Sequence, residues 1–145
     1  MSNIVHEVAA QLGGAATLGR SVRTDRDIET AIRKGFPLSV VAEIMHSAGL
    51  TLNELAASLD VSPRSLQRRR REGRLAKYES DRLYRLARVI ALATRSIGDA
   101  EAARRWLKLP NRALGGRTPL DVIDTEPGTR ALENVLGRIA YGGVS

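Results

Sequence analysis

Residues 51–71 constrain the fold of this chain more than any other segment, because they encode two short helices joined by a tight turn. Thr51 is followed three residues later by Glu54, a capping-box pattern that predicts the start of the first helix. Ser62 followed by Pro63 predicts the start of the second, since serine satisfies free amides and proline lacks the amide that the first helical position leaves unpaired. We expect the buried face of the first helix to consist of Leu52, Leu55, Ala56 and Leu59.

The spacing within this segment is that of a helix-turn-helix. Ala56 is small enough to let the two helices cross closely, and Asp60 stands at the turn four residues later. Val61 and Leu66 supply the apolar contacts that set the crossing angle. Glycine is more usual at the turn, where φ is often positive, but aspartate tolerates that conformation better than most residues. The pattern predicts a helix-turn-helix, which makes DNA the first partner to consider.

Almost the whole excess of positive charge lies in one short stretch. The chain has a formal net charge of +7, and residues 62–77 carry +6 of it. The basic residues of this stretch are Arg64, Arg68, Arg69, Arg70, Arg71, Arg74 and Lys77, against the single acidic residue Glu72. A localised basic patch on an otherwise balanced protein indicates a surface that binds a polyanion.

The four consecutive arginines at 68–71 cannot all lie on one face of a helix. At about 100° per residue, with Leu66 directed at the core, Arg69 and Arg70 lie on the flanks of Leu66. Arg68 is then best placed for a bidentate contact to guanine, and Gln67 for reading adenine. The residues that we assign to DNA binding are Ser62, Arg64, Gln67, Arg68, Arg71 and Arg74. The alternative is a solvated basic face, on which Arg69 and Arg70 cover apolar surface with their stems.

Composition favours helices throughout. Hydrophobic residues make up 43% of the chain but aromatic residues only 3%, so the core must consist of Leu, Ile, Val and Ala. No convincing period-2 run indicates a strand, and we predict an all-α fold. The absence of cysteine excludes disulfides and thiolate metal sites and suits a reducing cytoplasm. No apolar run approaches the roughly 20 residues that span a bilayer, and the N-terminus is a poor signal peptide, so we expect a cytoplasmic protein without membrane contact.

Apolar spacing and end signals indicate the remaining helices. In the first half we expect helices over 4–12, 27–34 and 38–48, and we expect the second helix of the helix-turn-helix to end at Gly73. In the second half we expect a helix from Ser80, as its N-cap, to Ile97 and another from Asp99 to Leu107. A short helix should follow Thr118, and a last helix should run from Pro127 up to the Gly142-Gly143 pair. Residues 15–26 are rich in Gly, Ser and Thr, which predicts a loop or mobile arm. The expected organisation is an N-terminal helix and flexible arm (1–26), a helix-turn-helix region (27–77) and a small C-terminal helical domain (78–145).

Catalysis is not indicated. His6 and His46 stand alone, without a carboxylate or nucleophile at a telling spacing. There is no glycine-rich phosphate loop and no cluster of metal ligands in the sequence. We therefore expect neither an enzyme nor a protein with a bound cofactor or metal.

A series of spaced motifs runs through the second half of the chain. They are the Arg-rich helix, Gly73-Arg74-Leu75, Glu79 to Leu83, Ala103 with Trp106-Leu107, Pro110 to Gly116, Thr118 to Asp121, Thr125 with Gly128, and Leu136 to Gly142. In this order and spacing they resemble the Xre/MbcA/ParS family of antitoxins, the partners of RES-domain toxins. Residues 1–26 match little in that family.

The resemblance implies a two-part antitoxin: a helix-turn-helix binds the promoter of its own operon, and a C-terminal helical domain dimerises and holds the toxin. It also implies that the RES toxin degrades NAD and that the C-terminal end of the antitoxin occludes the toxin's active site. The residues assigned to this contact are Tyr141, Gly142, Gly143, Val144 and Ser145. Two glycines let the chain leave the last helix at almost any angle, and the alternative is an end that simply frays.

Other residues are assigned to the interior and to dimerisation. The core or dimer interface is expected to contain Trp106, Leu132, Val135, Leu136 and Ile139. Arg82, Arg85 and Arg88 lie close to one helical face, where they extend the DNA patch, meet the toxin or are merely solvated. A homodimer is expected, since helix-turn-helix proteins usually read paired half-sites about 34 Å apart. The alternative function is a stand-alone dimeric transcriptional regulator that kept the fold without a toxin.

Overall fold

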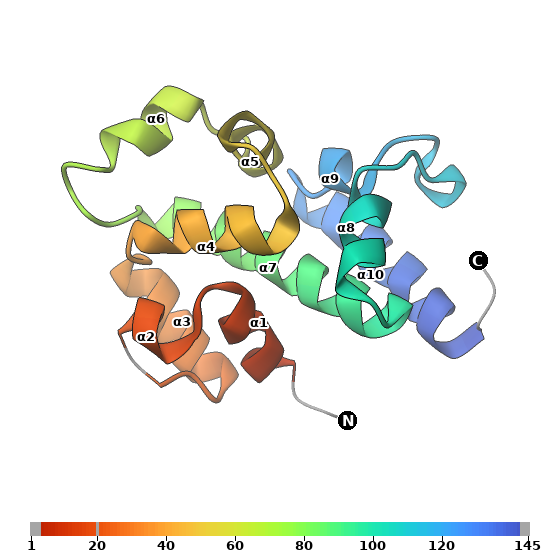
Figure 1. Cartoon of the computed structure of the whole chain (residues 1–145), viewed down its shortest axis with the longest axis horizontal. Coiled ribbons are helices and arrows are strands. Elements are labelled where there is room, and N and C mark those ends of the chain that lie inside the picture. Colours follow the sequence, from red (N-terminus) through yellow and green to blue (C-terminus); the bar gives the residue numbers. More distant parts are fainter. Residues whose placement is uncertain (1–3, 20, 143–145) are drawn as a thin grey trace.

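The computed structural model describes residues 4–19 and 21–142, and these residues form helices without a β-strand. The elements are α1 (Val5–Gln11), α2 (Gly14–Leu18), α3 (Asp25–Lys34), α4 (Ser39–Ala48), α5 (Leu52–Leu59), α6 (Pro63–Arg68), α7 (Lys77–Ile97), α8 (Ala100–Leu107), the 3-10 turn η1 (Arg112–Leu114), α9 (Pro119–Val122) and α10 (Glu126–Gly142). Figure 1 shows α1 to α3 on one side of α7 and α8 to α10 towards its other end. The prediction of an all-α fold is confirmed.

The central element is α7, which packs against α1, α3, α5, α8 and α10. An inner stripe of buried side chains runs along it and consists of Leu83, Leu86, Ala87, Ile90 and Ala93. Val89 and Ala91 are buried as well, so the apolar surface extends well beyond one narrow stripe. A helix of this kind is covered on several sides by neighbours, because each apolar face must be removed from water.

The N-terminal part is more ordered than the sequence indicates. The prediction that residues 15–26 form a loop or mobile arm is wrong for residues 15–18, which belong to α2, and for residues 25–26, which begin α3. Leu18 and Val22 are buried in the main core and tie this part of the chain to it. The helix α3 begins at Asp25, two residues earlier than predicted, because the Thr24 hydroxyl accepts a hydrogen bond from the amide of Asp27 at 3.2 Å.

The start of α7 also differs from the prediction, in which Ser80 was the N-cap. The helix begins at Lys77, and Ser80 lies fully buried within its first turn. The Ser80 hydroxyl donates to the carbonyl of Ala76 at 2.9 Å and accepts from the amide of Phe36 at 2.8 Å. Ser80 therefore joins α7 to the chain that follows α3.

The C-terminal elements begin close to where the sequence places them. Asp99 caps α8 by accepting from the amide of Ala102 at 2.8 Å, and Thr118 caps α9 together with Asp121. The last helix, α10, packs along α7 and begins at Glu126, one residue before Pro127. It continues through Gly142, which is the first glycine of the pair at which the helix was predicted to end.

Candidate functional site

The helix-turn-helix is formed by α5, residues 60–62 and α6. The Thr51 hydroxyl accepts from the Glu54 amide at 3.1 Å, and the Glu54 carboxylate accepts from the Thr51 amide at 2.9 Å. The hydrogen bond from the Thr51 backbone, with the charge of Lys108, lowers the pKa of Glu54. At the turn, Asp60 has φ 55° and ψ 46°, the left-handed conformation expected there.

The crossing of α5 and α6 is held by short contacts. The Ala56 carbonyl accepts from the amide of Val61 at 3.0 Å, and the side chain of Ala56 is only 1% exposed. Leu66 points inward and is 3% exposed, while the Ser62 hydroxyl accepts from the amide of Ser65 at 3.0 Å. Pro63 occupies the first turn of α6, as predicted.

The second helix of the motif is shorter than predicted. α6 ends at Arg68, and the next residues form successive turns, in which the amides of Arg69 and Glu72 donate to the carbonyls of Leu66 and Arg69. The expectation that the helix continues to Gly73 is therefore wrong beyond Arg68. Arg71 lies on this turn segment and not on the helix.

Arg69 explains why the chain turns there. Its Nε donates to Oε1 of Glu79 at 3.0 Å, and its Nη1 donates to Oε2 of Glu72 at 2.7 Å. The Glu79 side chain is fully buried, and its Oε1 also accepts from the amide of Ala76 at 2.7 Å. The hydrogen bond to Glu72 and the negative charge of Glu79 raise the pKa of Arg69. Arg69 is thus a structural residue that fastens the segment after α6 to α7.

Sequence reasoning missed Glu79 as the partner of Arg69. The only signal is indirect: Glu79 is a charged residue on the side of α7 that turns inward, next to the buried Ser80. A carboxylate buried in that position needs a cationic or hydrogen-bonding partner.

All six residues assigned to DNA binding are exposed to solvent. They are Ser62, Arg64, Gln67, Arg68, Arg71 and Arg74. Among the described residues, the guanidinium groups of Arg64, Arg68 and Arg71 have no hydrogen-bond or ion-pair partner. Arg74 differs, because its Nη1 donates to the carbonyl of Gly35 at 2.7 Å. Three arginines on and just after α6 are therefore free to meet a polyanion.

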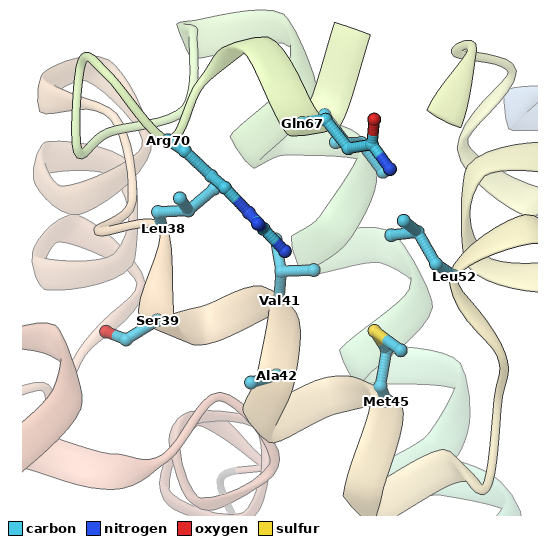
Figure 2. A pocket seen from close by; sticks show the side chains of 9 residues that line it. Leu38, Ser39, Val41, Ala42, Met45, Leu52, Gln67 and Arg70 are labelled. Carbon is cyan, nitrogen blue, oxygen red and sulfur yellow. The ribbon is translucent and has the colours of Figure 1, made fainter. Parts of the chain in front are cut away.

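An apolar groove of about 420 Å³ lies between α4 and α6. Figure 2 shows Val41, Met45 and Leu52 along the groove, with Gln67 at its rim and Arg70 reaching across towards Val41. Arg70 is exposed as a whole residue and also lines the groove, so its long side chain covers part of the apolar surface.

Arg82, Arg85 and Arg88 have partners inside the protein. Arg82 donates from Nη1 to the carbonyls of Leu59 and Asp60, at 2.9 and 3.2 Å. Arg85 donates to the carbonyl of Ile123 at 3.4 Å, and Arg88 pairs with Glu133 at 3.2 Å. These arginines join α7 to the helix-turn-helix, to the residue that follows α9 and to α10, and each therefore has a structural role.

The C-terminal residues assigned to the interior divide into two groups. Leu132, Val135 and Leu136 are buried. Trp106 and Ile139 pack against the core but remain partly exposed, and both line a cleft of about 640 Å³ between the loop after α8 and the end of α10. For the tail assigned to the toxin, Tyr141 and Gly142 continue α10, whereas Gly143, Val144 and Ser145 lie outside the described residues.

Two kinds of site are absent from the described part of the chain. Among residues 4–19 and 21–142, no group of three or more His, Cys, Asp or Glu side chains is placed to hold a metal ion. No helix within the same ranges is long and apolar enough to cross a membrane.

The fold and the basic α6 define a helix-turn-helix protein with an added C-terminal helical domain. Residues 27–88 match the antitoxin Xre-like helix-turn-helix domain, and residues 92–142 match the antitoxin Xre/MbcA/ParS C-terminal toxin-binding domain. The chain is 33% identical over 141 residues to an antitoxin Xre of Pseudomonas putida, covering 97% of this chain and 87% of that protein. It therefore belongs to the Xre antitoxin family, as the sequence motifs indicate.

Further comparisons agree with this assignment. An antitoxin Xre of Photorhabdus laumondii is 30% identical over 131 residues, covering 89% of this chain and 88% of that protein. Among solved structures, a chain of the M. tuberculosis MbcT–MbcA toxin–antitoxin complex is similar, with a TM-score of 0.54 and 30% identity over 74% of this chain and 96% of that chain. The protein is thus an antitoxin that carries a helix-turn-helix domain.

Proposed function

We propose that this antitoxin neutralises a RES-domain, NAD-degrading toxin, which it binds through the C-terminal domain and inhibits by placing its C-terminal end in the toxin's active site. The observation that carries the proposal is the match of residues 92–142 to a toxin-binding domain. The similar solved chain comes from a toxin–antitoxin complex, which supports the same kind of partner. The protein acts here by occlusion and needs no catalytic group or cofactor of its own.

The geometry of α10 suits this role. Its inner residues, including the fully buried Leu132 and Leu136, are packed in the core, and the helix then runs on to Gly142. Figure 1 shows this end of the helix on the far side of the molecule from α6. A helix anchored at its base and directed outward presents the following residues to a partner at a defined place, with little ordering cost before the tail itself.

Removal of the tail tests the proposal directly. A chain that ends after Ala140 keeps the packed part of α10, so it should fold and still bind the toxin, but it should fail to restore growth when both proteins are produced in cells. The toxin to be used is the product of an adjacent reading frame with a RES-type sequence, and full-length antitoxin is the control. Equal rescue by the truncated chain would rule out occlusion by the C-terminal end.

We further propose that the helix-turn-helix binds operator DNA and thereby regulates the antitoxin's own operon. The exposed, unpaired Arg64, Arg68 and Arg71 support this proposal, with Gln67 as a base-reading residue. Ser62 at the start of α6 suits a phosphate contact, and Arg74 is the sixth assigned residue. A homodimer is proposed because paired half-sites need two reading helices about 34 Å apart. Such a protein would work in the cytoplasm and on the nucleoid when bound to its operator.

A stand-alone dimeric transcriptional regulator is the competing function. The same unpaired arginines fit it, since DNA binding by itself requires no toxin. If the full-length protein binds operator DNA but neither binds nor counteracts the neighbouring gene product, the regulator is the right description.

A further inference from the structure

The unpaired positive charges of the C-terminal part are few and unevenly placed. Within residues 78–142, most Lys and Arg side chains pair with a carboxylate or donate to a backbone carbonyl of the same protein. Among the described residues of this range, the exceptions are Arg105, Arg112 and Arg138, which have no such partner and are exposed. Two of these three, Arg112 and Arg138, line the same cleft.

That cleft, which we call the Trp106 cleft, has an apolar lining between the two arginines. Trp106, Val135 and Ile139 contribute apolar surface to its lining, and Pro110 contributes from the loop after α8. The neighbouring Leu109 is 56% exposed, an unusual position for a large aliphatic side chain in this protein. An apolar hollow bordered by unpaired cations is the pattern of a binding surface.

The loop that forms one wall of the cleft is held in place by its own hydrogen bonds. The Asn111 side chain accepts from the amide of Ala113 at 2.9 Å, and the Asn111 backbone exchanges hydrogen bonds with Arg117 and Gly116 at 2.9 Å each. Because Asn111 is occupied in this way, the wall is formed before any partner arrives. A preformed cleft binds with a smaller ordering cost than a mobile loop.

We propose that the Trp106 cleft is a second docking site for the toxin, and that it receives an apolar side chain flanked by carboxylates. The two exposed arginines favour negative charge on the occupant, and the apolar lining favours an aliphatic or aromatic anchor. Arg138 and Ile139 lie in the α10 turn that leads to Gly142, so the cleft is continuous with the surface assigned to the tail. This inference rests on the proposed function, and it separates affinity, supplied by the cleft, from inhibition, supplied by the tail.

A charge-removal pair tests the cleft in the full-length protein. The Arg112→Ala/Arg138→Ala double variant should bind the purified toxin from the neighbouring reading frame about 30-fold more weakly, as two lost charged contacts would give. The matched control is Arg105→Ala/Arg130→Ala, which removes the same charge from α8 and α10 outside the cleft. It should stay within about 2-fold of the wild-type dissociation constant, the range of a rim charge.

A second variant tests the shape of the cleft without changing charge. Ala113 is exposed and lines the cleft, so Ala113→Trp should fill the cleft and leave the packed core unchanged. It should weaken toxin binding at least as much as the double variant, while operator DNA binding by both stays at the wild-type level. That unchanged DNA affinity shows that the variants are folded.

Several results would overturn the inference. Unchanged toxin affinity in both cleft variants, or an equal loss in the Arg105/Arg130 control, would show that the cleft has no special part in binding. Conversion of a dimer of the isolated protein into monomers by Ala113→Trp would assign the cleft to a second copy of this chain. If the wild-type protein does not bind the toxin, the proposed function itself fails, and this inference fails with it.

Discussion

At the scale of single residues, adjacent arginines in the run 68–71 have different tasks. Arg69 is only 18% exposed in its side chain and is committed to Glu79 and Glu72. Arg68 and Arg71 are exposed and have no partner among the described residues. A guanidinium group that is already hydrogen-bonded to a buried carboxylate is not available to DNA, whereas a solvated one loses little when it binds a phosphate or a base.

The first prediction concerns these two free arginines. Arg68→Ala/Arg71→Ala should weaken operator binding in a gel-shift titration by at least about tenfold, because each arginine contact to a base or phosphate contributes roughly 1 kcal/mol or more. The thermal midpoint should stay close to that of the wild type, since neither side chain is packed. An unchanged operator affinity in the folded double variant would contradict the DNA-binding assignment.

At the scale of elements, the helix-turn-helix depends on its ends more than on its length. α6 has only 6 residues, too few to be stable alone, and its start is fixed by Ser62 and Pro63. Leu66 supplies its contact with the core. The turn before it requires a left-handed residue, and Asp60 is the one non-glycine residue with positive φ in the described part of the chain.

Asp60 gives a prediction at this scale. Asp60→Gly should preserve or raise the thermal midpoint, whereas Asp60→Ala should be less stable than the glycine variant by about 1 kcal/mol, because a Cβ is disfavoured in the left-handed region. The control is Ala57→Gly, an exposed position inside α5, where glycine should cost about 1 kcal/mol. Equal midpoints for Asp60→Gly and Asp60→Ala would show that the turn relaxes to another conformation.

At the scale of the whole molecule, α7 connects the two functional parts. The main core extends from Ile4 to Val135 without a break at the expected boundary between residues 77 and 78. Arg82 fastens α7 to the turn of the helix-turn-helix, and Arg88 fastens it to α10. A core shared in this way predicts that both parts unfold together.

Arg69→Ala tests this cooperativity. The variant leaves the buried Glu79 without its cationic partner and should lose about 3 kcal/mol of unfolding free energy. Trp106, the single tryptophan, reports on the C-terminal part, far along the chain from the substitution. Urea unfolding followed by Trp106 fluorescence and by far-UV circular dichroism should therefore shift by the same amount. A shift in circular dichroism alone would mean that the helix-turn-helix unfolds separately.

Local rules predicted much of this protein from its sequence. The predicted capping box at Thr51, the predicted cap at Ser62 and the left-handed Asp60 are all present, and helices begin after Asp99 and Thr118 as expected. These features depend on groups within four residues of each other, so the sequence determines them before any tertiary contact forms. The apolar stripe of α7 was predictable for the same reason, because helical periodicity is a local property.

Tertiary contacts decided the rest. Ser80 was expected to cap a helix, but its hydroxyl instead accepts a hydrogen bond from the amide of Phe36, 44 residues away. Arg69 was expected to lie on the second helix of the helix-turn-helix, but it lies beyond the end of α6 and pairs with Glu79, 10 residues away. Arg88 forms an ion pair with Glu133, which is 45 residues away along the chain. A buried polar side chain needs a hydrogen-bonding partner, and folding can supply that partner from any distance along the chain. The spacing of residues in the sequence therefore does not identify the partner. Local sequence signals therefore determined where most of the helices form, whereas the folded structure decided the exceptions, such as α2 and the early end of α6, and which arginines remain free to bind DNA or a toxin.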